Sequence, residues 1–221
     1  GHILPQKIID LPHMGTLNIH ASLLPALRGA GPIQAAIRQG FSETGVSVMR
    51  VVPALDAGPV LLQARSQILD DETLGELQNR LAELGALTLI EALTLLSLGK
   101  AKETVQDDSR ATYAPKVTRE SSQINWRDSA VEISRLIRAS DPKPGAFTKT
   151  PKGDVKLFGP KVMDGIKGNP GEVLKITGDL VIACGVDALR ISEVQPSGKT
   201  RMSAHEWARG RGTAMGDRYG E

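Results

Sequence analysis

The chain has 221 residues, of which 40% are apolar and 24% charged, as in an ordinary globular protein. No run approaches about 18 successive apolar residues, so we expect no membrane span and no membrane partner. A single cysteine excludes a disulfide framework, and no basic-then-apolar leader indicates secretion. A cytoplasmic location is the default expectation. Because the chain starts with glycine rather than methionine, we also expect that an amino-terminal segment precedes it.

The net charge of +2 is divided unevenly along the chain. Residues 1–112 hold 9 lysines and arginines against 12 aspartates and glutamates, a net charge of −3. Residues 113–221 hold 18 against 13, a net charge of +5. A basic half is typical of a surface that meets a polyanion, but lysine-rich turns facing water give the same balance. Composition alone leaves both interpretations open.

Strand and helix signals alternate in the first half of the chain. The predicted elements are, in order, a strand over residues 15–20, a helix over 31–40, a strand over 46–52 and a helix over 73–99. The last helix opens with a capping-box pattern formed by Thr73 and Glu76, and leucines then recur at helical spacing. Strand, helix, strand, helix is the order typical of an α/β domain with a mainly parallel sheet.

Turns dominate the second half. An extended linker over residues 113–120 leads to a short helix, whose capping box is formed by Ser129 and Glu132. Turns rich in proline and glycine then separate short apolar runs, which are residues 171–176, 180–184 and 188–194. Several short strands at this spacing predict a small β-barrel or sandwich. We therefore expect one domain over residues 1–112, the linker over 113–120, and a second domain over 121–221.

Two polar side chains stand at the end of the first predicted strand. Because side chains alternate across a strand, Asn18 and His20 point to the same face, away from the apolar residues between them. Ligands bind beyond the carboxyl ends of parallel strands, and Asp56 follows the second strand, so Asp56 can face His20. The alternative is purely structural. An Asp before Ala-Gly often forms a turn, and a lone strand histidine is often a hydrogen-bonded core residue.

Two common cofactor-binding motifs are only partly present in this sequence. Gly198-Lys199-Thr200 resembles the end of a phosphate-binding loop, but Glu193 stands where that pattern needs its first glycine. The arginine- and glycine-rich residues 209–212 lack the strand-to-helix context of a dinucleotide fingerprint, and no histidine pair has zinc spacing. The sequence therefore predicts neither a metal enzyme nor a nicotinamide enzyme.

A longer stretch carries a family resemblance. Residues 18–61, NIHASLLPALRGAGPIQAAIRQGFSETGVSVMRVVPALDAGPVL, closely resemble the signature region of the 10-formyltetrahydrofolate-dependent formyltransferases, and GHILP resembles the segment shortly before it. Residues 111–126 and 195–210, with the helix after Ser129, resemble the linker and carboxyl-terminal domain of one branch, the methionyl-tRNA formyltransferases. The resemblance implies the carboxyl-terminal part of a Rossmann-like formyltransferase domain, followed by a small OB-like β-barrel that binds tRNA.

The resemblance also implies a site. The family's catalytic asparagine, histidine and aspartate fall on Asn18, His20 and Asp56. The residues implied for the folate are Ser22, Leu23, Leu24 and Pro25 in the family's Ser-Leu-Leu-Pro loop, and Ile3 and Leu4 at the pterin pocket. The reaction implied is formyl transfer from 10-formyltetrahydrofolate to the α-amine of methionyl-initiator tRNA, for translation initiation and without a metal. The resemblance further implies a monomer whose partners are the initiator methionyl-tRNA and a small-molecule folate.

The chemistry explains these residue types. Attack of the amine on the formyl carbon makes a tetrahedral centre with a developing oxyanion. Asn18 and His20 can each donate an N–H to that oxygen, and preorganised donors of this kind are each worth about 10²- to 10³-fold in rate. Asp56 would orient the imidazole and, directly or through a water, receive a proton from the attacking amine.

Two other functions stay open at the level of the sequence. Relatives in the same enzyme class formylate the amino sugar of a nucleotide sugar, and their carboxyl-terminal domain has a segment similar to residues 195–199. From a different class, a non-catalytic fragment would only bind RNA through residues 121–221. A gel shift with tRNA against a nucleotide sugar separates the two enzyme functions, and a formylation assay separates both from a fragment that only binds RNA.

Overall fold

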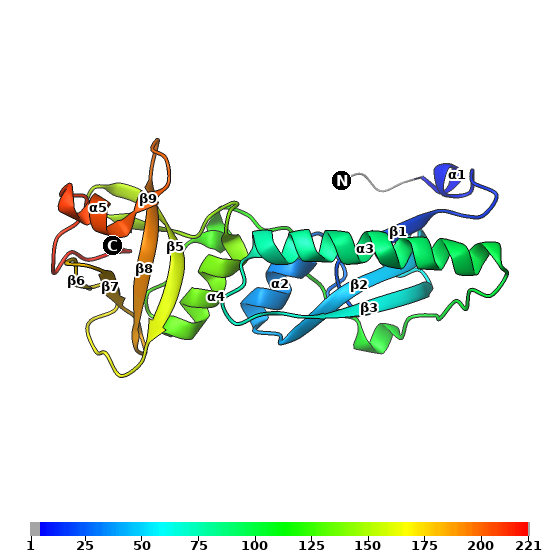
Figure 1. Ribbon diagram of the computed structural model, residues 1–221, viewed down its shortest axis with the longest axis horizontal. Coiled ribbons are helices and arrows are strands. Elements are labelled where there is room, and N and C mark those ends of the chain that lie inside the picture. The colour runs from blue at the N-terminus through cyan, green and yellow to red at the C-terminus, as the bar shows by residue number, and fades with distance from the viewer. Residues whose placement is uncertain (1–4, 221) are drawn as a thin grey trace. The chain divides into compact units, whose positions relative to one another are not determined.

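In a computed structural model that describes residues 5–220, the chain divides into two compact units, Gly1–Lys116 and Val117–Glu221 (Figure 1). The first unit contains α1 (Gln6–Ile9), β1 (Leu17–His20), α2 (Pro32–Gln39), β2 (Glu43–Arg50), β3 (Val60–Gln67), α3 (Leu74–Ser97) and the short 3₁₀ helix η1 (Asp108–Arg110). The second unit contains η2 (Glu120–Ser122), α4 (Ala130–Ser140), β4 (Phe147–Thr150), β5 (Gly153–Met163), β6 (Val173–Lys175), β7 (Leu180–Ala183), β8 (Ala188–Pro196), β9 (Met202–Ser203) and α5 (Ala204–Arg209).

The sheet of the first unit has three strands in the order β1-β2-β3, and both neighbouring pairs run antiparallel. The expectation of a mainly parallel sheet is therefore wrong for the strands that the structure describes. The loop after β1 folds back so that the Leu27 carbonyl meets the His20 ring, which keeps the chain beside the end of β1. Since α2 then has only eight residues, about 12 Å, β2 starts next to that same end and runs back along β1.

The long helix of the first unit starts where the sequence predicts. Thr73 accepts a hydrogen bond from the Glu76 backbone N–H, and the Glu76 carboxylate in turn accepts from the Thr73 N–H, which completes the capping box. The helix α3 then runs for 24 residues and lies across β2 and β3 (Figure 1). It ends at Ser97, with Leu98 as the C-cap before Gly99, which lies in the left-handed region at φ 64°. Local sequence signals thus define this helix at both ends.

The second unit is an antiparallel sheet of six strands, in the order β4-β5-β8-β7-β6 with β9 paired to β8. One apolar core lies under this sheet. The core includes Ile133 and Ile137 of α4, Leu157 of β5, Leu180 and Ile182 of β7, Leu189 and Ile191 of β8, and Trp207 of α5. A small antiparallel sheet around one core fits the predicted OB-like barrel. The strands β4 and β5 were not predicted from the sequence.

Residues 5–220 contain neither a helix that could span a membrane nor a cluster of metal-binding side chains. Among the helices within residues 5–220, the 24-residue α3 included, none is both long enough and apolar enough to cross a membrane. Over the same residues, no three side chains of His, Cys, Asp or Glu gather closely enough to hold a metal ion.

Candidate active site

The strand β1 presents its two faces to different surroundings. Ile19 faces α3, where a Cβ added at Gly85 would lie 3.0 Å from the Ile19 side chain. Asn18 and His20 point to the opposite face because side chains alternate along a strand. His20 is only 6% exposed, whereas Asn18 is exposed to solvent. This face therefore offers a buried imidazole and, two residues before it, an accessible amide.

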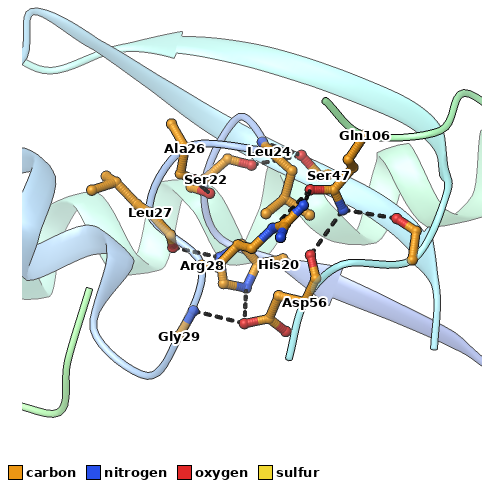
Figure 2. Close-up of polar contacts among 11 residues, drawn as sticks. His20, Ser22, Leu24, Ala26, Leu27, Arg28, Gly29, Ser47, Asp56 and Gln106 are labelled. Atoms are coloured by element: carbon orange, nitrogen blue, oxygen red, sulfur yellow. Dashed lines mark hydrogen bonds and ion pairs between the residues drawn. The ribbon is translucent and has the colours of Figure 1, made fainter. Parts of the chain in front are cut away.

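The imidazole of His20 lies between two acceptors (Figure 2). Its Nε2 atom is 2.9 Å from the Leu27 carbonyl oxygen, and its Nδ1 atom is 3.6 Å from Oδ2 of Asp56. That same Oδ2 accepts a hydrogen bond of 2.7 Å from the Gly29 backbone N–H. The structure thus brings His20 and Asp56 together as predicted, but the predicted reason does not hold, because β1 and β2 run antiparallel.

These contacts define where the ring carries its protons. A carbonyl oxygen only accepts, so Nε2 of His20 must be the donor to Leu27. In a neutral ring this leaves a lone pair on Nδ1, facing the Asp56 carboxylate. Only when Nδ1 is protonated as well does the ring form an ion pair with Asp56. The 3.6 Å separation is longer than a usual hydrogen bond, so Asp56 leaves the hydrogen-bonding capacity of Nδ1 unused in this arrangement.

The predicted folate loop, residues 22–25, packs on the same face of the sheet. The Ser22 hydroxyl is buried and donates to the Ala26 carbonyl at 2.6 Å, and Leu24 is buried against Met49 and Val60. Leu23 and Pro25 are half-buried, and the Leu24–Pro25 peptide bond is cis. The remaining two residues predicted to contact the folate, Ile3 and Leu4, lie outside the described residues.

A row of polar side chains lies beside this loop, and sequence reasoning missed the two of them that anchor it, Ser47 and Gln63. His20, Ser47 and Gln63 stand opposite one another on β1, β2 and β3. The Ser47 hydroxyl donates to the Ser22 carbonyl at 2.7 Å and accepts from the Leu24 N–H at 3.1 Å. The Gln63 amide donates to the Leu24 carbonyl at 2.9 Å and to the Ser47 hydroxyl at 2.8 Å. The polar Ser47 within the apolar run of β2 was the one available signal.

Two further side chains lie behind Asp56. Arg28, which is 3% exposed, and Gln106 form a hydrogen-bonded pair that reaches the backbone of the Asp56 loop (Figure 2). Arg28 belongs to the signature stretch, but no sequence pattern marks Gln106. The site therefore consists of an imidazole and a carboxylate in a fixed relation, an exposed amide on the same strand face, and a tightly held loop beside them.

Both halves of the chain match known families. Residues 1–93 match the formyl transferase family, and residues 116–212 match the carboxyl-terminal domain of formyl transferases. The buried histidine beside an aspartate in the first unit and the OB-like barrel of the second unit thus belong to one class of protein, the formyl transferases.

Individual relatives narrow this class. The methionyl-tRNA formyltransferase of Methylococcus capsulatus is 44% identical over 94% of this chain and 68% of its own length. That of Pseudomonas putida is 45% identical over 90% of this chain and 64% of its own length. The chain belongs to the methionyl-tRNA formyltransferase family. It spans about two thirds of the length of these relatives.

Solved structures agree on the fold. HypX from Aquifex aeolicus in complex with tetrahydrofolic acid has a TM-score of 0.70 and 25% identity, and the match covers 86% of this chain and 34% of HypX. An N-formyltransferase from Helicobacter canadensis, crystallised with folinic acid and dTDP-3-aminofucose, has a TM-score of 0.66 and 18% identity over 79% of this chain and 64% of its own. These comparisons confirm the predicted fold, a formyltransferase domain followed by a small OB-like barrel.

Proposed function

We propose that this chain, within its complete protein, transfers a formyl group from 10-formyltetrahydrofolate to the α-amine of methionine on initiator tRNA. The observation that carries the proposal is the buried His20, whose Nδ1 faces Asp56 on the strand face that also bears Asn18. Relatives at 44% and 45% identity are named for this reaction. The N-formyltransferase crystallised with dTDP-3-aminofucose is less similar, at 18% identity.

Charge develops at one atom in this reaction. The amine attacks the formyl carbon, and the carbonyl oxygen becomes an oxyanion as the carbon turns tetrahedral. Asn18 would donate its amide N–H to that oxygen, and His20 would donate from Nδ1, because Nε2 is committed to Leu27. Donation from Nδ1 requires a proton on that atom as well, and the group nearest to it is the Asp56 carboxylate, 3.6 Å away. Each such donor is worth about 10²- to 10³-fold in rate.

Asp56 has a second role in this proposal. The attacking amine must lose a proton as the new C–N bond forms, and a carboxylate within reach can accept it. Oδ2 is held by the Gly29 N–H and faces His20, and the Asp56 side chain is 16% exposed. The partly exposed carboxylate supports direct proton transfer or transfer through one water.

We assign the loop of residues 22–25 to the folate. Its backbone is fixed by Ser47 and Gln63, so it offers a rigid wall rather than a flexible lid. Rigid contacts of this kind lower the entropy lost on binding. The half-buried Leu23 and Pro25 are the side chains that we expect to touch the pterin, together with Ile3 and Leu4.

The second unit would hold the tRNA through its phosphates. The backbone N–H of Gly220 bonds to the Lys149 carbonyl, and the Lys152 ammonium bonds to the Arg211 carbonyl, so these basic residues gather at one end of the sheet. Arg201 is different. Asp141 and Glu193 bind its guanidinium at 2.9 Å and 2.6 Å, and it stacks 4.0 Å from the Phe158 ring centroid. Arg201 therefore supports the fold, and the exposed lysines are the candidates for phosphate contacts.

A choice of acceptors tests the proposed function. The complete protein is incubated with 10-formyltetrahydrofolate and either methionyl-initiator tRNA or a dTDP-linked amino sugar, and formylated product is measured by mass spectrometry. We expect turnover with the tRNA alone. Turnover with the amino sugar alone would assign this protein to the sugar-modifying branch, and no turnover with either would leave only RNA binding.

A further inference from the structure

The connection between the two matched domains runs past the candidate active site. Residues 94–115 lie in neither matched family region. Within them, Thr104 pairs with Val60 through two backbone hydrogen bonds of 2.8 Å. Further on, the Thr112 hydroxyl accepts from the Leu27 N–H at 2.9 Å, and the Thr112 carbonyl accepts from the Arg28 N–H at 2.8 Å. This segment therefore touches both loops that carry contacts of His20 and Asp56.

Gln106 stands between these two anchor points and reaches the Asp56 loop. Its Nε2 atom donates to the Asp56 carbonyl at 2.8 Å and to the Gly58 carbonyl at 2.7 Å (Figure 2). Asp56 has φ 48°, in the left-handed region that residues other than glycine rarely adopt. A strained residue keeps such a conformation only where its surroundings hold it. Gln106 supplies two of those holding contacts.

Arg28 fixes the direction of the Gln106 amide. Its Nε and Nη2 atoms donate to Oε1 of Gln106 at 3.1 Å and 2.8 Å, while Nη2 also bonds Asp108 at 2.7 Å. Because the guanidinium can only donate, it forces the amide oxygen toward itself and the amide nitrogen toward Asp56. Arg28 is 3% exposed, so its two bonds to Gln106 are shielded from water on the Arg28 side, whereas its partner Asp108 is exposed. Arg28, Gln106 and the Asp56 loop thus form a chain of directed hydrogen bonds.

We propose that Gln106 is a positioning residue for formyl transfer: oriented by Arg28, it holds the Asp56 loop so that Oδ2 faces His20. The inference rests on the proposed function, because it assigns a role in that same site. In this proposal the connecting segment, residues 94–115, supports the active site in addition to joining the two matched domains. Misplacement of a reacting group by about 1 Å can cost about 10²-fold in rate, so the loss of these bonds should appear in kcat.

The test distinguishes the role of the Gln106 amide oxygen, which binds Arg28, from that of its amide nitrogen, which binds the Asp56 loop. Gln106→Glu keeps an acceptor for Arg28 but removes the donor to the Asp56 and Gly58 carbonyls. Gln106→Met removes both the acceptor and the donor while keeping a side chain of similar size. The control is Gln78→Glu, the same change at an exposed position on α3. Each variant is made in the complete protein. Amide hydrogen exchange over residues 54–58, thermal unfolding, and kcat and KM for both substrates are then measured.

We expect Gln106→Glu to speed exchange over residues 54–58 and to lower kcat by about tenfold or more, with both KM values unchanged. Gln106→Met should lose activity to a similar degree and melt at a lower temperature, since Arg28 then lacks its partner. The Gln78→Glu control should match the wild type. Unchanged exchange in Gln106→Glu would overturn the inference whatever the activity, and faster exchange with wild-type kcat would overturn the positioning role. If the wild type itself transfers no formyl group, the proposed function fails, and the exchange result still decides whether Gln106 holds the loop.

Discussion

Oδ2 of Asp56 lies 3.6 Å from Nδ1 of His20 and at the same time accepts a 2.7 Å hydrogen bond from Gly29. The other ring nitrogen of His20 bonds Leu27, two residues before Gly29. One short loop therefore fixes both partners of the pair, the imidazole through a carbonyl and the carboxylate through an N–H. Such mutual fixing is what preorganised catalysis needs, because neither group has to reorient when charge develops.

The first prediction concerns the folate loop. Ser22→Ala removes the 2.6 Å bond to the Ala26 carbonyl and should loosen the loop, not the His20–Asp56 pair. The loss of one hydrogen bond of about 1 kcal/mol should raise the Kd for the folate about fivefold while kcat at saturation stays near the wild type. Isothermal titration calorimetry and steady-state kinetics measure the two quantities. Ser97→Ala at the exposed end of α3 is the control, and a loss of kcat with normal folate binding would assign Ser22 to the chemical step instead.

The second prediction uses the buried Cys184. Burial raises the pKa of this thiol from its ordinary 9.0 to about 12. At pH 8 the native thiolate fraction should thus be lower by about 10³-fold than in the unfolded chain, and alkylation by iodoacetamide correspondingly slow. Because the native pKa is the higher one, this group contributes stability below pH 9 that is lost as the pH rises toward 12. Rapid alkylation of the native protein at pH 8, at a rate independent of denaturant, would contradict the burial of this thiol.

The third prediction concerns the start of α3. Thr73→Ala removes the capping bond to the Glu76 N–H and should lower the free energy of unfolding by about 1 kcal/mol at pH 7. The hydrogen bonds from Thr73 hold the pKa of Glu76 below its ordinary 4.5. That part of the stabilisation is therefore present above pH 4.5 and is lost as the pH falls through the lowered pKa, so the difference between variant and wild type should narrow in acid.

Urea unfolding at pH 7 and pH 3 measures this difference. The matched control is Thr94→Ala, an exposed position in the interior of the same helix. Its effect should be small, since alanine has the higher helix propensity. An equal loss of stability in both variants would show that the cap itself is not the source.

The fourth prediction concerns the second unit and its salt dependence. If Lys149 and Lys199 neutralise tRNA phosphates, replacing both by alanine should lower the slope of log K against log salt by up to about two units. Different tRNAs should weaken nearly equally, because phosphate contacts position without specifying. The control is the double change Lys100→Ala and Lys102→Ala, which removes the same charge from exposed positions in the first unit. An equal drop in slope for both double variants would mean that net charge, and not this surface, determines binding.

Local signals determined which parts of the fold could be predicted. The capping boxes at Thr73 and Ser129 located α3 and α4 because each motif satisfies backbone donors within one turn. The predicted strand direction was wrong in the first unit. Whether β2 runs parallel or antiparallel to β1 depends on the path of the loop after His20, and no local sequence pattern encodes that path. The strand β3 was missed because its residues alternate between half-buried and exposed positions with polar side chains such as Gln63 and Arg65.

For the site, too, the sequence predicted what local patterns or the family resemblance encode, and it missed contacts that depend on the folded chain. Side-chain alternation placed Asn18 and His20 on one face, and the family resemblance pointed to Asp56 as their partner. Gln106 lies 50 residues beyond Asp56, in a segment with no periodicity and no motif, so only the folded chain brings the two together. The structure contributed the ring contacts of His20 in the same way, because the carbonyl of Leu27 is a backbone group that side-chain patterns do not reveal.

The most direct measurement is the single-turnover rate of formyl transfer to methionyl-initiator tRNA by the complete protein and its Asp56→Asn and His20→Ala variants. Asp70→Asn, an exposed position in the first unit, is the control, and thermal unfolding verifies that every variant is folded. The account predicts that Asp56→Asn and His20→Ala each lower the rate by at least about 10²-fold, with Asp70→Asn at the wild-type rate. A wild-type rate in folded Asp56→Asn or His20→Ala would contradict a catalytic role for this pair.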